Sequence, residues 1–258
     1  ETNDDRRGEG HYQMAMKAMD LLKKYGILFG TSICYTRNNI NAVTSDEFLQ
    51  MIADKGAKYG FYFHYMPVGN NAVPELMPTP EQRKYMINRI RELRTEKYKD
   101  LTFFPMDFQN DGDKTGGCIA GGRNYFHINS AGDAEPCVFI HYSNMNIHEH
   151  TIIEILQSPL FKAYHEGQPF NENHLRPCPM LENPDALREM VKRTGAHSTD
   201  LESPEDVDHL CSKCDEYAKN WKPEAEKIWN DERKRIQEKN EGRYQNFSKE
   251  YKQKMSMK

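Results

Sequence analysis

The sequence predicts an α/β fold that continues into a small α+β domain carrying most of the cysteines. Strand-like apolar runs alternate with helical patterns up to about residue 108, which is typical of a parallel sheet with crossover helices. A polar, glycine-rich stretch then ends this alternation, and a hairpin pattern with short helices follows. We therefore predict an α/β part at residues 1–109, a cysteine-bearing domain at residues 110–220, and a charged tail, helical or disordered, at residues 221–258.

The first part contains three predicted helices and three predicted strands. Its first helix, residues 11–25, is expected to end at Gly26, and Ser45 and Thr79-Pro80 have the composition of helix starts. The strands are expected at residues 27–35, 59–66 and 101–108. The residues expected to form helical apolar faces are Met14, Ala18, Leu21 and Leu22 in the first helix and Met86, Ile90 and Leu93 in the third.

Strand, helix and strand at this spacing favour parallel pairing. Three strands are too few to close a barrel, so they correspond to the last part of a barrel or to one edge of an open sheet. In the second part, residues 110–122 are glycine-rich and residues 124–129 and 135–142 predict a hairpin with a Gly-Asp turn. Helices are expected at residues 151–165 and 184–194, and an acidic loop at residues 198–208.

Charge and hydropathy exclude several classes of protein. The 258 residues carry a net charge of -4, which gives no general reason to bind nucleic acid, although the charged last stretch leaves RNA contact open as an alternative to a solvated helix. No apolar run is long enough to cross a membrane. The polar start lacks a signal peptide, so we expect a cytoplasmic protein. Because residue 1 is Glu, we also expect the sequence to be the C-terminal portion of a longer protein.

Cysteine placement is the strongest chemical signal. Cys118 lies in Gly-Gly-Cys-Ile-Ala-Gly-Gly, Cys137 ends a G-x4-C pattern, and Cys178 lies between two prolines. Cys211 and Cys214 form a C-x-x-C pair, whose spacing lets two thiolates face one metal. In a reducing compartment such cysteines more often bind metal than form disulfides. Cys34 lies in an apolar run, so it is expected to be structural.

A site of several thiolates suits either zinc or an iron–sulfur cluster. A C-x2-C pair with a second cysteine pair is the usual zinc-ribbon arrangement, but here Cys118 and Cys137 are separated by 18 residues. Spacing alone separates the two metals poorly. A zinc-stabilised binding module without catalysis is therefore the alternative to an iron–sulfur protein.

The cysteine pattern resembles the auxiliary-cluster extension of radical S-adenosylmethionine (SAM) enzymes, known as the SPASM domain and in its shorter form as Twitch. The resemblance rests on Cys118-x13-Gly132-x4-Cys137, with the aromatic residues Tyr125 and Phe126 ahead of Gly132, and on later cysteines that end in C-x-x-C. It implies one auxiliary [4Fe–4S] cluster, because five thiols cannot fully ligate two. The implied ligands are Cys118 and Cys137 plus two of Cys178, Cys211 and Cys214.

The first part resembles the end of the radical SAM (β/α) partial barrel. The stretch from Asp4 to Gly10 is similar to a motif after the fourth strand, and residues 36–40, Thr-Arg-Asn-Asn-Ile, resemble the end of the fifth strand. The resemblance implies SAM contacts at Ser32, Arg37 and Asn39. The alternatives are a buried hydroxyl for Ser32 and an ordinary surface loop for the other two residues.

Two departures limit what the resemblance implies. The defining C-x3-C-x2-C loop is absent, so this chain alone cannot hold the cluster that cleaves SAM, and we expect that loop upstream. Some members also place an Asp directly after the G-x4-C cysteine as a catalytic base. Here that residue is Val138, which weighs against the sulfatase-maturating subgroup.

The implied activity is that of a radical SAM oxidoreductase or maturase. In this family a 5′-deoxyadenosyl radical, made from SAM at a second [4Fe–4S] cluster, abstracts a substrate hydrogen. The auxiliary cluster anchors substrate or accepts an electron. The implied partners are a peptide, protein or small-molecule substrate and a reductant such as flavodoxin or ferredoxin. The sequence identifies no catalytic side chain.

Overall fold

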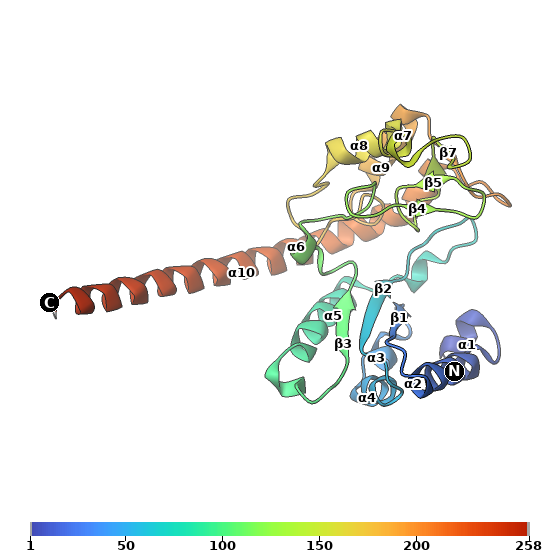
Figure 1. The fold of residues 1–258 in the computed structure, drawn as a ribbon. Helices are drawn as coiled ribbons and strands as arrows, with labels where there is room; N and C mark the ends of the chain where they lie inside the picture. Colours follow the sequence, from blue (N-terminus) through green and yellow to red (C-terminus); the bar gives the residue numbers. More distant parts are fainter. Residues whose placement is uncertain (1, 257–258) are drawn as a thin grey trace.

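The protein has a three-stranded parallel sheet in one part, a cysteine-rich part beside it, and one long C-terminal helix (Figure 1). This computed structural model describes the backbone of residues 2–256 and the side chains of residues 3–4 and 7–238. Asp5 and Arg6 of the predicted Asp4–Gly10 motif lie outside the described side chains. The α/β class expected from the sequence is confirmed, with the sheet in the order β1-β2-β3.

All three strands of the sheet run parallel, and their register is continuous from β1 through β2 to β3. Gly30 pairs with Tyr59, which in turn pairs with Phe104. The strands are β1 (Gly30–Tyr35), β2 (Tyr59–His64) and β3 (Phe104–Asp107). The elements that precede and connect them are α1 (Thr2–Arg7), α2 (His11–Lys24), α3 (Ile40–Val43), α4 (Asp46–Asp54), η1 (Pro74–Leu76), α5 (Pro80–Leu93) and η2 (Glu96–Tyr98).

Helix starts in this part follow the capping rules. The Ser45 hydroxyl accepts a hydrogen bond from the Phe48 backbone N–H at 3.1 Å, and Thr79 and Gln82 form a reciprocal capping box at the start of α5. Asp4 caps α2, because its carboxylate accepts hydrogen bonds from the backbone of Gly10 and Tyr12. The sequence analysis did not predict α1 or this cap.

One face of the sheet packs on the helices, and the other face is more open. Ile33, Tyr35 and Tyr62 point toward the helices and are buried with Met86, Ile90 and Leu93, as the helical pattern of α5 predicted. Alternate residues point the opposite way. On that opposite face Ser32 and Phe61 are exposed, and Cys34 is half-buried. Cys34, which the sequence predicted to be structural, is thus on the open face rather than in the core, because its neighbours Ile33 and Tyr35 occupy the covered face.

The predicted apolar face of α2 also differs from the observed one. Of the predicted face, Leu22 packs against the core, whereas Met14, Ala18 and Leu21 are exposed. Met16 also packs against the core and Met19 is buried; residues three apart share one face of a helix, so the contact with the sheet part selects Met16, Met19 and Leu22. β1 begins at Gly30 rather than at residue 27, and the Ile27 and Leu28 side chains are exposed.

The cysteine-rich part is built from short elements. The predicted hairpin is present as β4 paired antiparallel with β5, and β6 pairs with β7 near the end of this part. The helix expected at residues 151–165 is split in two, because Ser158 and Pro159 begin a new helix. The elements are α6 (Gly112–Thr115), β4 (His127–Ile128), β5 (Ala134–Glu135), β6 (Tyr142–Ser143), α7 (Ile152–Leu156), α8 (Pro159–Gly167), α9 (Pro184–Thr194) and β7 (His197–Ser198).

α10 (Val207–Ser256) begins inside the cysteine-rich part and extends away from the body (Figure 1). Its first turns carry Cys211 and Cys214, and Trp221 and Ala225 lie buried further along the same helix. Pro223 lies within the helix. No helix among the described residues has the length and apolar character that crossing a membrane requires.

A fully buried ion pair joins the two parts of the body. The Arg83 guanidinium on α5 donates to Glu182 at 2.6 Å, to Asn110 at 2.7 Å and to the Tyr217 hydroxyl at 3.1 Å. It also donates to the Leu175 carbonyl oxygen and lies 4.4 Å from the Trp221 ring centroid. Both charged side chains are completely inaccessible to solvent. The Arg83 guanidinium of α5 therefore contacts both the Cys178 loop and α10.

We predict that breaking this ion pair destabilises the protein strongly. Glu182→Gln leaves Arg83 buried without its counter-charge and should lower the free energy of unfolding by about 3–5 kcal/mol. Replacing both residues, as Arg83→Met with Glu182→Leu, should cost less than the sum of Arg83→Met and Glu182→Leu made singly. Urea denaturation measures Glu182→Gln, these two single variants and the double variant.

The matched control is Glu189→Gln, which breaks the exposed pair between Glu189 and Arg193. Its effect should stay within about 0.5 kcal/mol. Equal effects of Glu182→Gln and Glu189→Gln would show that the buried pair does not hold the two parts together.

Candidate metal centre

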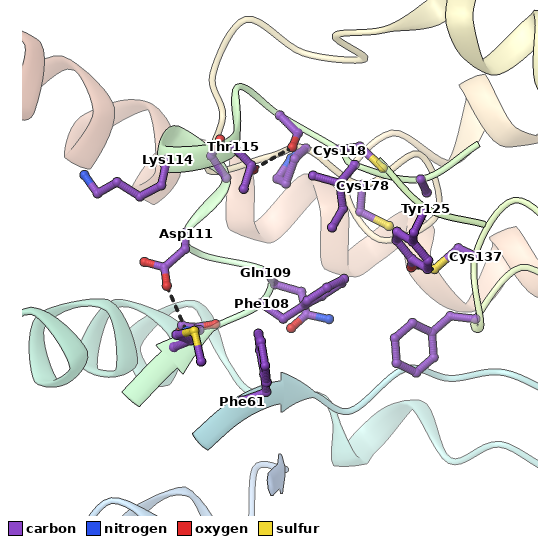
Figure 2. Close-up of a pocket in the computed structure, with 18 of the residues that line it drawn as sticks. Phe61, Phe108, Gln109, Asp111, Lys114, Thr115, Cys118, Tyr125, Cys137 and Cys178 are labelled. Carbon is purple, nitrogen blue, oxygen red and sulfur yellow. Dashed lines mark hydrogen bonds between the residues drawn. The ribbon is translucent and has the colours of Figure 1, made fainter. Parts of the chain in front are cut away.

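Three cysteines line one cavity of about 540 Å³ between the sheet and the cysteine-rich part. Cys118, Cys137 and Cys178 lie together on one side of this cavity, with Tyr125 among them (Figure 2). Phe61 of β2 and Phe108, just after β3, form another part of its wall. The cavity therefore extends from the thiols to the carboxyl ends of parallel strands, where α/β proteins commonly bind ligands.

Separate local structures hold the three thiols. Cys118 follows the turn of Gly116 and Gly117, whose positive φ angles any other residue would adopt with strain. Cys137 follows β5, and its carbonyl oxygen accepts from the Ile140 N–H at 2.9 Å. The Cys178 backbone N–H donates to Glu182 at 2.8 Å, so the Arg83 ion pair also fixes this loop.

Cys211 and Cys214 lie on α10 rather than in a loop. They are three residues apart and both are fully buried, so they occupy one face of the helix. All five of these cysteines lie in or against a single hydrophobic cluster, although Cys211 and Cys214 do not line the cavity. Within the described part of the chain, no three His, Cys, Asp or Glu side chains are close enough to hold a single metal ion.

Burial sets the protonation of these thiols. It raises the pKa of Cys118 to about 12 and that of Cys211 to about 12, and it raises the pKa values of Cys137, Cys178 and Cys214 as well. Without a metal the thiols are therefore protonated at neutral pH. A metal binds thiolates, so loading this site must release protons.

Two tyrosines complete the thiol end of the cavity. The Tyr125 hydroxyl lies 2.8 Å from the Cys137 sulfur. Tyr164 of α8 also lines the cavity and is fully buried, yet its hydroxyl has no hydrogen-bond partner among the described residues. Buried tyrosine hydroxyls are normally hydrogen-bonded, so this orphaned group points to something that occupies the cavity.

The donor set fits an iron–sulfur cluster. Three thiols arranged around a cavity, next to hydroxyl groups that can donate to sulfur, match the protein environment of such clusters. Sequence reasoning located the thiols but did not identify Tyr164, Arg83 or Glu182. Tyr164 carries no signal beyond an aromatic residue on a helix, and the ion pair joins residues that are distant in the sequence.

The residues predicted to contact SAM lie apart from this cavity. Ser32 is on the open face of β1, and Arg37 lines a second cavity of about 770 Å³ between residues 74–81 and α10. Asn39 is buried and structural in its contacts, because it accepts from the Thr36 N–H and donates to the Cys34 carbonyl oxygen. Of the three residues, only Arg37 lines one of these two cavities, and their role remains a prediction.

Comparison with known proteins identifies the cysteine-rich part. Residues 118–180 match the family model of SPASM, described as an iron-sulfur cluster-binding domain. This segment is similar to SPASM domains. The resemblance of the cysteine pattern to SPASM is thereby confirmed, and the match contains Cys118, Cys137 and Cys178, the same three cysteines that line the cavity. No curated protein matches the chain.

Solved structures of anSMEcpe are similar to this chain at low identity. Native anSMEcpe with bound AdoMet has 14% identity and a TM-score of 0.47, and the match covers 85% of this chain and 61% of that one. Native anSMEcpe with bound AdoMet and the Cp18Cys peptide has 14% identity and a TM-score of 0.45, with 85% and 63% coverage. This chain therefore spans less than two thirds of those proteins.

Gly121 packs closely against Tyr164, a residue that lines the cavity. Its φ is +68°, and an added Cβ would lie 2.5 Å from the Tyr164 Cβ. Gly195 has a φ of +64° but has nothing within 4 Å of an added Cβ. Both Gly121→Ala and Gly195→Ala should lose about 1–2 kcal/mol of stability from backbone strain. Gly121→Ala should lose a further 1–3 kcal/mol, roughly, from the clash.

Chemical denaturation of both variants measures the difference. Equal losses in the two variants would show that Tyr164 is not packed against Gly121.

Proposed function

We propose that this chain holds the auxiliary [4Fe–4S] cluster of a radical SAM oxidoreductase or maturase. The observation that carries the proposal is the convergence of three SPASM cysteines on one cavity at the ends of β2 and β3. Residues 1–109 would then form the end of the radical SAM partial barrel, residues 110–220 the auxiliary-cluster domain, and residues 221–258 a charged tail.

Cys118, Cys137 and Cys178 would supply three ligands, and Cys211 or Cys214 the fourth. Support for the first three is their shared cavity and their place in the SPASM match. Support for the C-x-x-C pair is that it packs in the same hydrophobic cluster as the other thiols.

When bound, the cluster would supply one-electron redox chemistry, or an iron site that anchors substrate. The chain's own residues would prepare its surroundings. Phe108 and Phe139 form apolar wall that excludes water, and burial of this kind is one of the levers that set a cluster's potential. Gln109, Asp111 and Lys114 also line the cavity, but Asp111 is paired with Arg94 and Lys114 with Asp113.

The substrate and partners belong to the same proposal. A cavity that joins the thiols to the strand ends has room for part of a peptide, protein side chain or small molecule. SAM would bind the barrel part with Ser32, Arg37 and Asn39 as contacts, at a second [4Fe–4S] cluster held outside this sequence. A reductant such as flavodoxin or ferredoxin would supply electrons. Val138, where some relatives have a catalytic Asp, is half exposed and offers no base.

Iron loading tests this function directly. Anaerobic reconstitution of the chain with iron and sulfide should give a brown protein with broad visible absorbance and about four irons per chain. Elemental analysis and absorbance spectra provide the measurement. Colourless protein that instead retains one zinc ion through dialysis would support the zinc-stabilised binding module and overturn the proposal.

Single cysteine substitutions test the ligand set. Cys118→Ala, Cys137→Ala and Cys178→Ala should each lose most of the iron, because each removes a thiolate from the cavity. Cys34→Ala is the matched control and should keep it, since Cys34 lies on β1 and outside the cavity lining.

Of Cys211→Ala and Cys214→Ala, the variant that loses more iron identifies the fourth ligand. Loss of iron in Cys34→Ala with retention in Cys137→Ala would contradict the assignment. Circular dichroism of each variant separates loss of a ligand from loss of the fold.

A further inference from the structure

Tyr164 is a buried polar group that the fold leaves without a partner. Its side chain is fully inaccessible to solvent, it lines the cavity, and its hydroxyl makes no hydrogen bond to any described residue. An unsatisfied buried hydroxyl costs about 1–3 kcal/mol. A buried tyrosine of the sheet part shows the usual arrangement, since the Tyr62 hydroxyl donates to the Val43 carbonyl oxygen at 2.8 Å.

The surroundings fix the Tyr164 ring in place. Gly121 lies directly against its Cβ, and the Phe170 ring packs edge-on at 5.4 Å between centroids. The Ser158 cap and Pro159 determine where α8 begins, and therefore which face of the helix carries Tyr164. A ring held on several sides cannot turn its hydroxyl to solvent to find a partner.

The electrostatic surroundings keep Tyr164 a donor. Burial, together with negative charge on Cys118, Cys137 and Cys178, holds the pKa of Tyr164 well above its usual range. The hydroxyl therefore keeps its proton when the thiols become thiolates. Burial and the same three cysteines also raise the pKa of Tyr125, and its hydroxyl already contacts the Cys137 sulfur. Tyr164 is the second tyrosine that lines the cavity with these thiols, and its hydroxyl has no partner among the described residues.

We propose that the Tyr164 hydroxyl donates a hydrogen bond to a sulfur atom of the bound cluster and thereby raises its reduction potential. This inference rests on the proposed function, because it requires a cluster in the cavity. A hydrogen bond to sulfur favours the reduced cluster, which carries more negative charge, so the potential moves upward. Tyr164 is a positioning and tuning residue rather than a ligand.

The proposal predicts different effects of Tyr164→Phe on stability without the cluster and on the reduction potential with it. In the protein without iron, Tyr164→Phe removes an unsatisfied hydroxyl, so the urea midpoint should stay equal or rise. In the reconstituted protein, the same variant should keep its iron but show a lower midpoint potential in a redox titration. If Tyr164 only fills space, Tyr164→Phe should leave the reduction potential of the cluster unchanged.

Tyr62→Phe is the matched control. It removes a buried tyrosine hydroxyl whose partner, the Val43 carbonyl oxygen, lies in the helix-covered part of the sheet. It should lower the urea midpoint of the iron-free chain and leave the cluster potential unchanged. Site-specific 3-fluorotyrosine at position 164 provides a second variant, because it keeps the ring and strengthens the donor, so it should raise the potential.

The outcomes separate the two proposals. Wild-type protein that takes up no iron would overturn the proposed function itself. Wild-type protein that loads iron, with the same potential in Tyr164→Phe and in the fluorotyrosine variant, would overturn the role of Tyr164 alone. A folded Tyr164→Phe protein that cannot hold iron would assign the residue a structural role and would also overturn the proposal.

Discussion

The buried ion pair between Arg83 and Glu182 is the constraint on which the rest of the structure depends. Both side chains are withdrawn completely from water, and the Arg83 guanidinium has a separate partner on each element it meets. Glu182 uses its second oxygen for the Cys178 backbone. One charged contact thus sets the position of a thiol, of α10 and of the sheet relative to one another. Low solvent access makes its geometry specific, because any misplacement leaves a buried charge without a partner.

Much of the fold could be predicted from local sequence rules. The starts of α4 and α5, the inward face of α5 and the parallel sheet follow from capping residues and apolar periodicity. The α2 face and the position of Cys34 could not be predicted. Met14 and Met19 are equally apolar, and only the place where α2 contacts the sheet part decides which one is buried. The pleat of β1 likewise decides that Ile33, and not Cys34, faces the helices.

The candidate site could likewise be predicted only in part. Its cysteines have a recognisable spacing, and the SPASM match covers three of them. The tyrosine hydroxyls and the ion pair around these cysteines have no sequence signal, because they depend on contacts between residues far apart in the chain. The sequence could also not show that Cys211 and Cys214 lie on a helix. A C-x-x-C spacing occurs in ribbons, loops and helices, and only the structure shows that here the pair lies in the first turns of α10.

Placement of the C-x-x-C pair on α10 ties the orientation of two thiols to a distant anchor. Trp221 is buried two turns beyond Cys214, with its indole N–H donating to the Leu175 carbonyl oxygen at 3.0 Å. An α-helix turns by about 100° for each residue, so the number of residues between Cys214 and Trp221 sets the direction in which both sulfurs point. The residue types between Cys214 and Trp221 can vary, but inserting or deleting even one residue there would rotate the thiols away from the interior.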